Sequence, residues 1–109
     1  MELSEVKTIL SGTGLPVAYR AWPDDPANNL PPPLPWIVYL ETGSQNFSAD
    51  GVVYLAIKSI RIELYTKEKD PTSERKVETA LSNAGIFWNK TEEYLDDEQC
   101  YEIIYEIEV

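Results

Sequence analysis

The last nine residues of the chain alternate regularly enough to predict their own secondary structure. Within residues 101–109, every second side chain is apolar, and Glu102, Glu106 and Glu108 lie between them. Successive side chains of a strand point to opposite faces of a sheet, so this segment predicts a strand with one buried and one open face. Ile104 is the only break in the pattern. A sheet with one buried face needs a second layer to cover it.

Two segments are predicted to form helices in that layer. Residues 3–11 repeat apolar side chains at helical spacing, with Ser4 as the expected N-cap and either Gly12 or Gly14 as the expected terminator. Asp70-Pro71 opens a longer helix, because aspartate suits the N-cap and proline suits the first helical position. Gly85 is expected to end that second helix.

The other regular segments read as strands. Residues 36–41 are almost continuously apolar, which predicts a strand covered on both faces. Further strand candidates are residues 17–22, 52–55, 58–66 and a strand that begins at 86–88, followed by an acidic turn region at 92–98. The order of elements predicts one α+β domain over residues 1–109, an antiparallel or mixed β-sheet with two α-helices packed on one face.

Long loops are expected near residues 23–35 and 42–51. The first is rich in proline, which disfavours regular structure, and it is either a stiff connection or a polyproline ligand for an aromatic groove. The second is polar and is expected to be an extended hairpin arm or a loop. Within it Gln45, Asn46 and Phe47 form a candidate contact with another subunit, the alternative being an ordinary loop.

The charge of the chain excludes several classes of function. Its formal net charge is −10 and it contains no histidine, so it lacks the basic stripe that nucleic-acid binding requires and the commonest metal ligand and general base. Eight acidic residues and no basic residue lie between Glu92 and Val109. We expect no enzymatic activity, no metal, no cofactor and no direct sequence-specific binding of nucleic acid.

The compartment is also constrained by the sequence. Cys100 is the only cysteine, so we expect no internal disulfide and a reducing environment. The first residues show no basic region followed by an apolar stretch, which predicts no signal peptide. No apolar run approaches the length of about 20 residues that a membrane span needs, so no membrane association is expected.

The acidic C-terminal segment has several interpretations. It could be a solvated sheet face, although a row of like charges along one strand is repulsive unless a neighbouring strand or subunit brings a cation. It could mimic the phosphates of DNA and inhibit a nucleic-acid-binding protein. An enzyme that uses paired carboxylates would need a pocket that holds two of them, one with a raised pKa.

Aromatic residues complete the set of candidate interface residues. Trp22 and Trp36 flank the proline-rich loop, where they either pack in the core or lie at a subunit contact. The full set of interface candidates is Trp22, Trp36, Gln45, Asn46, Phe47, Glu102, Glu106 and Glu108.

Four segments carry a resemblance to a known family. A short N-terminal helix leads to residues 14–19, a proline-rich passage leads into residues 35–39, residues 62–70 precede a helix, and residues 101–106 close the chain. In this order they resemble the small tail-completion and head–tail joining proteins of long-tailed bacteriophages and prophages. The resemblance covers nearly the whole chain and rests on the order of elements.

The resemblance implies a structural role without catalytic residues. It implies assembly into a homo-oligomeric ring, commonly of six copies, that ends growth of the tail tube and meets the head connector. The partners would be tail-tube and head-connector proteins. The protein would be found in the host cytoplasm during assembly and then in the virion, at the tail or the head–tail junction. Both a tail terminator and a head-side connector fit, and an acidic DNA-mimic inhibitor is the alternative function.

Overall fold

The computed structural model describes the backbone of residues 1–109 and all side chains except those of Ala49, Tyr54 and Leu55. The elements in chain order are α1 (Leu3–Ser11), β1 (Val17–Tyr19), η1 (Pro26–Asn28), β2 (Trp36–Ala49), β3 (Val52–Thr66), α2 (Pro71–Asn83), β4 (Trp88–Leu95) and β5 (Cys100–Glu108). The sheet has the strand order β1-β2-β3-β5-β4. Only the β1–β2 pair is parallel.

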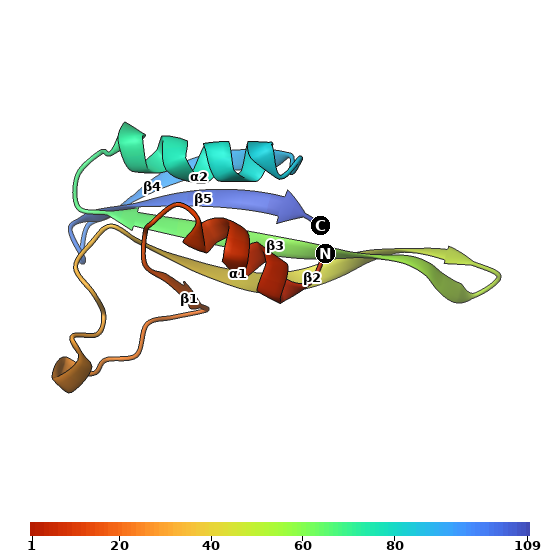
Figure 1. The fold of residues 1–109 in the computed structure, drawn as a ribbon, viewed down its shortest axis with the longest axis horizontal. Helices are drawn as coiled ribbons and strands as arrows, with labels where there is room; N and C mark the ends of the chain where they lie inside the picture. Colours follow the sequence, from red (N-terminus) through yellow and green to blue (C-terminus); the bar gives the residue numbers. More distant parts are fainter.

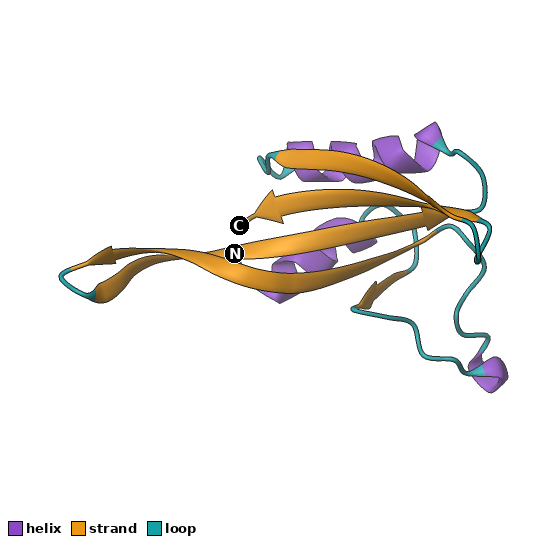
Figure 2. Cartoon of the chain, turned by 180° about the vertical axis from the view of Figure 1, so that it is seen from behind, coloured by secondary structure: helices purple, strands orange, loops and turns teal.

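The two helices lie on the same face of the sheet, which confirms the predicted α+β fold with a mixed sheet. Figure 1 shows α1 and α2 in front of the strands, and Figure 2, seen from behind, shows the opposite face of the sheet toward the viewer. We call this opposite side the open face. In the described part of the chain, neither helix is long and apolar enough to cross a bilayer.

The hydrophobic core lies between the helices and the sheet. It combines side chains from both helices with the alternate side chains of the three central strands that point toward them. Its fully buried members include Val6, Leu10, Ile37, Ile62, Leu64, Val77, Leu81, Ile103 and Tyr105. The predicted inward face of the last strand is therefore confirmed, because Ile103, Tyr105 and Ile107 are all buried.

Local signals set the ends of the helices. Helix α1 covers the predicted residues, but its N-cap is Glu2, which makes no side-chain hydrogen bond, so the expected cap at Ser4 is wrong. In α2 the Asp70 Oδ1 accepts a hydrogen bond from the backbone N–H of Ser73 at 3.0 Å, as the sequence predicts for an N-cap. Gly85 follows α2 with a φ of 73°, a left-handed conformation that glycine adopts at little cost.

Several strands differ in extent from the expectation. Strand β1 ends at Tyr19, and Arg20 has a φ of 72° that breaks the extended conformation before the predicted end at residue 22. Residues 52–55 and 58–66 are not separate strands but belong to the continuous β3. Strand β4 extends to Leu95, so Glu92 and Glu93 lie in a strand and not in the predicted acidic turn.

The segment at residues 42–51 is a hairpin arm and not a loop. Strands β2 and β3 stay paired from Gly43–Ser59 to Ala49–Val52, and the connection consists of Asp50 and Gly51. Both have positive φ, 53° and 75°, as a tight type I′ hairpin turn requires. The other expected loop, near residues 23–35, is irregular apart from the short η1.

Candidate protein interface

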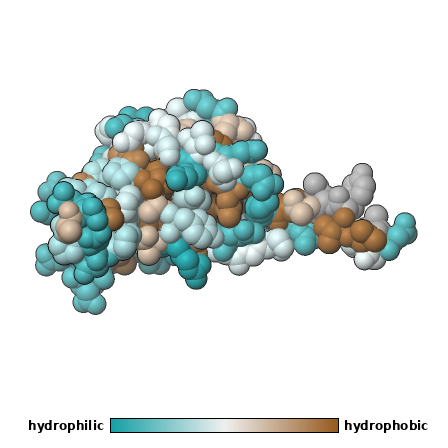
Figure 3. All heavy atoms as spheres, turned by 60° about the horizontal axis from the view of Figure 1, so that its bottom comes forward, coloured by the Kyte–Doolittle hydropathy of each residue, from teal (hydrophilic) through white to brown (hydrophobic). Residues whose placement is uncertain are grey.

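The hairpin arm projects from the body of the molecule. Figures 1 and 2 show the paired ends of β2 and β3 extending beyond the helices, the other strands and both termini. Phe47, Val52 and Val53 on this arm are 59%, 67% and 57% exposed. Figure 3 shows hydrophobic surface on the arm. Exposed apolar side chains gathered on one element are typical of a protein-interaction surface.

The arm is also nearly uncharged. Between Thr42 and Ile57, Asp50 at the turn is the only charged residue, although the chain as a whole carries −10. An isolated two-stranded ribbon is at best marginally stable in water. A partly apolar ribbon outside the core with a single charged residue therefore suits a contact with another protein surface better than exposure to solvent.

The open face carries two neighbouring carboxyl groups, of which Glu102 is buried and Glu63 is partly buried. Tyr65 pairs in register with Glu102, and Glu63 with Ile104, across β3 and β5. The Tyr65 hydroxyl donates a hydrogen bond to Glu102 Oε2 at 2.7 Å. Glu102 is only 7% exposed. The sequence places Glu102 on an outward strand face, but in the structure it is covered by its neighbours.

Burial changes the protonation of Glu63. The pKa of Glu63 rises from its ordinary value of 4.5 to about 7, first because burial disfavours the charged carboxylate, and then because Glu63 shares a hydrogen bond with Glu102 and feels its charge. The Arg61 Nε, 3.5 Å from Glu63 Oε2, opposes this shift. Burial and the bond to Glu102 also raise the pKa of Tyr65. The Glu63 carboxyl therefore retains its proton up to about neutral pH.

An enzyme that uses paired carboxylates needs a pocket that holds both of them and a raised pKa for one, and Glu63 and Glu102 meet only the second condition. One carboxyl has a raised pKa, but the pair does not line the largest depression described on the surface. Among the described residues, no group of three or more histidine, cysteine, aspartate or glutamate side chains is placed to hold a metal ion. Burial and the charges of Glu98 and Glu102 raise the pKa of Cys100, which keeps it a thiol.

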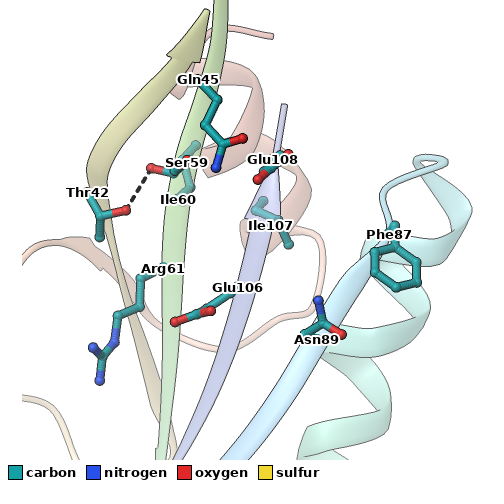
Figure 4. A pocket seen from close by; sticks show the side chains of 10 residues that line it. All are labelled: Thr42, Gln45, Ser59, Ile60, Arg61, Phe87, Asn89, Glu106, Ile107 and Glu108. Carbon is teal, nitrogen blue, oxygen red and sulfur yellow. Dashed lines mark hydrogen bonds between the residues drawn. The ribbon is translucent and has the colours of Figure 1, made fainter.

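The largest described depression lies where the arm joins the body. Its volume is about 510 Å³. Figure 4 shows Thr42 and Gln45 from the base of the arm, Glu106 and Glu108 from β5, and Phe87 just before β4 around this depression. The Thr42 hydroxyl donates a hydrogen bond to the carbonyl oxygen of Ser59 at 3.2 Å. Two predicted interface elements, the 42–51 segment and the acidic C-terminal strand, are thus brought together here.

The two tryptophans lie at the opposite end of β2. Trp22 packs edge-to-face on Trp36 with ring centroids 6.2 Å apart, and Trp36 packs on Tyr65 at 4.7 Å. Both tryptophans are half-buried. They attach the beginning of the proline-rich loop to the end of the sheet, which favours packing over a role as exposed binding anchors.

The candidate residues thus fall into separate groups. Gln45, Asn46 and Phe47 are exposed on the arm. The other candidates are Glu106 and Glu108, exposed near the base of the arm, Glu102, buried on the open face, and the tryptophan pair at the far end of β2.

Sequence reasoning missed five residues of these surfaces: Val52, Val53, Glu63, Tyr65 and Phe87. Phe87 is 79% exposed. The alternation of residues 58–66 does place Glu63 and Tyr65 on the outward face, but no local signal shows that β5 will lie beside them. The exposure of Val52 and Val53 could have been anticipated from an unbroken hairpin, because its far end has no layer above it.

A network of ion pairs lies between α2 and β4. Glu74 is 4% exposed and forms salt bridges with Lys69 at 2.7 Å and Lys90 at 3.1 Å. Glu78 binds Lys90 at 2.9 Å and accepts a hydrogen bond from the Tyr105 hydroxyl at 2.7 Å. These contacts occupy two cations and two carboxylates in fixing α2 to the sheet.

Comparisons with known proteins give no family for this chain. No protein-family model matches it, and no curated protein is significantly similar to it.

Proposed function

We propose that this protein is a structural subunit that assembles with other protein chains through its hairpin arm. The observation that carries the proposal is the exposure of Phe47, Val52 and Val53 on an arm that has one charged residue and extends beyond the core. In a monomer that binds no other protein, such a ribbon would add little to the stability of the fold. Two contact surfaces, the arm and a separate acceptor for it, are what a ring subunit requires.

Within that class, the resemblance noted in the sequence favours a tail-completion or head–tail joining protein of a long-tailed phage or prophage. The protein would form a homo-oligomeric ring, commonly of six copies, between tail-tube and head-connector proteins. It would assemble in the host cytoplasm and remain in the virion. The resemblance implies a central sheet flanked by helices, and the mixed sheet with two helices on one face supports the proposal to that extent.

The test is inactivation of the gene in the phage or prophage that encodes it, followed by electron microscopy of the particles. We expect unjoined heads and tails, or tails of uncontrolled length, and recovery when the intact protein is supplied from a plasmid. Normal infectious particles without the protein would contradict the proposal. Tight, salt-sensitive binding of the purified protein to a DNA-binding protein of the host would instead support the DNA-mimic alternative.

A further inference from the structure

A second depression lies on the helical side of the molecule. It has a volume of about 420 Å³ between the end of α1 and the outer surface of α2. Its lining includes Thr13, Thr72, Arg75, Lys76, Thr79 and Asn83, and we call it the α1–α2 groove. Ala80 contributes apolar surface to it. The groove is open to solvent and lies on the other side of the sheet from Glu63 and Glu102.

The α1–α2 groove is cationic, although the chain is strongly acidic. Arg75 and Lys76 are both exposed, and among the described side chains neither forms a salt bridge. Glu74 is buried and Glu78 is bound to Lys90, so among the acidic residues of α2 and its cap only Asp70 acts on these cations, through its charge interaction with Lys76. Two copies of a chain with a net charge of −10 repel each other, so a contact between them is favoured where one side is locally positive.

The hairpin arm is complementary to this groove. It presents the apolar side chains Phe47 and Val53, and its single charge is the carboxylate of Asp50 at the turn. We propose that the arm of one copy docks in the α1–α2 groove of a second copy, with Asp50 next to Arg75 and Lys76. The identity of the occupant as a second copy rests on the proposed function as a ring subunit.

The arm is placed to reach another molecule and not its own groove. From Gly43 to Asp50 a strand spans about 23 Å at its usual rise per residue. This segment points away from the body, whereas the groove lies on the body beside α2 (Figure 1). A contact between two different surfaces leaves each copy with one free arm or one free groove, so repetition closes into a ring or continues as a filament.

Disulfide trapping tests the contact directly. In a full-length Cys100→Ala background, chains with Ser48→Cys on the arm are mixed with chains that carry Thr79→Cys in the groove, under mild oxidation. We expect a cross-linked dimer of the two variants. The control pairs Ser48→Cys with Thr91→Cys, an exposed position on β4 that lies outside the groove. A yield for Thr79 no higher than for Thr91 would overturn the inference.

Charge reversal supplies a second readout in the same assay. Asp50→Lys on the arm chain should lower the rate of cross-linking about tenfold, because like charges then meet at the contact. Combining it with Arg75→Glu and Lys76→Glu on the groove chain should restore the rate. Loss without restoration would mean that Asp50 does not meet these cations and would overturn the proposed pairing.

The outcomes separate this inference from the proposed function. Cross-linking together with normal particles after gene inactivation would retain the arm–groove contact and reject the phage role. Defective particles without cross-linking would retain the assembly role and assign the arm to a different protein, such as a tail-tube subunit.

Discussion

At the scale of single residues, the partly buried Glu63 has a raised pKa and keeps its proton to a higher pH than an exposed glutamate. Its side chain is only 14% exposed, and the buried Glu102 lies close enough to share a hydrogen bond with it. Ionising Glu63 is costly, first because burial disfavours the carboxylate and then because of the hydrogen bond and the charge of Glu102, so its pKa rises to about 7. Arg61 offsets only part of that cost.

The consequence is a stability that depends on pH. Because the pKa of Glu63 in the folded chain exceeds its ordinary value of 4.5, the folded chain keeps a proton that the unfolded chain releases as the pH rises from 4.5 to 7. The stability associated with that proton is present below pH 4.5 and is lost as the pH rises through 7. Glu63→Gln removes the ionisation, so it should be nearly neutral at pH 5 and stabilising by about 1 kcal/mol at pH 8.

Urea unfolding of both proteins at pH 5 and pH 8 measures this difference. Glu106→Gln is the matched control, because it makes the same chemical change at an exposed carboxylate of the open face. A Glu63→Gln effect that is the same at both pH values would show that Glu63 is already ionised in the folded chain at pH 5.

At the scale of elements, α2 and the arm differ in how they are stabilised. Helix α2 is held by the Asp70 cap, by the fully buried Val77 and Leu81, each worth about 1.5–3 kcal/mol, and by the salt bridges of Glu74. The arm beyond Gly43 has hydrogen bonds between its own two strands but exposes its apolar side chains. The free energy that stabilises the ordered arm must therefore come from its turn, from the pairing of its two strands and from contact with a partner.

Polar substitutions on the arm should therefore separate folding from assembly. We expect Phe47→Ser with Val53→Ser to change the melting temperature by no more than about 2 °C, because neither side chain is in the core. The same variant should reduce particle yield at least tenfold when it replaces the intact protein. Tyr94→Ser, at an exposed aromatic residue of β4 that lies outside the arm and the depression at its base, is the matched control.

Thermal unfolding and plaque counts give the two measurements. A large loss of melting temperature in the double variant would place Phe47 and Val53 in the folded core. Full particle yield would show that the exposed apolar side chains of the arm are not contacts in assembly.

At the scale of the whole molecule, the charge is distributed unevenly around the fold. Of the eight acidic residues after position 91, Glu102 is buried and Glu92 binds Lys69, whereas Glu106 and Glu108 are exposed beside the base of the arm. The cationic α1–α2 groove lies on the helical side. The two faces of the molecule thus differ in charge. This difference favours a contact between unlike surfaces of two copies over a contact between like surfaces.

Neutralising the exposed acidic side chains of β5 tests their role in the particle. In a ring through which DNA passes, carboxylates at the lumen would repel the DNA and ease its passage. Glu106→Gln with Glu108→Gln should leave folding intact and lower infectivity several-fold. Glu2→Gln with Glu5→Gln, the same change of charge at exposed positions in the cap and the first turn of α1, is the control. Infectivity equal to that of the intact protein would remove these two residues from the proposed function.

Some features of this protein were determined by the sequence alone. The bounds of α1, the Asp70-Pro71 start of α2 and the inward face of β5 were all predicted, because capping, helical spacing and alternation act between residues close in the chain. The α+β class followed from the order of these elements. The hairpin form of residues 42–51 was one of two alternatives, and the Asp50-Gly51 turn was the local signal that could have decided it.

Only the tertiary structure decided what the acidic strand does. Residues 101–109 do alternate, but the open face that this pattern predicts is not uniformly solvated. The register of β3 against β5 places Tyr65 opposite Glu102 and buries the Glu102 carboxyl beside Glu63. Glu106 and Glu108, on the same face, remain exposed. That register joins residues nearly 40 positions apart. Local spacing fixes which way a side chain points, whereas only packing fixes which other side chains it meets.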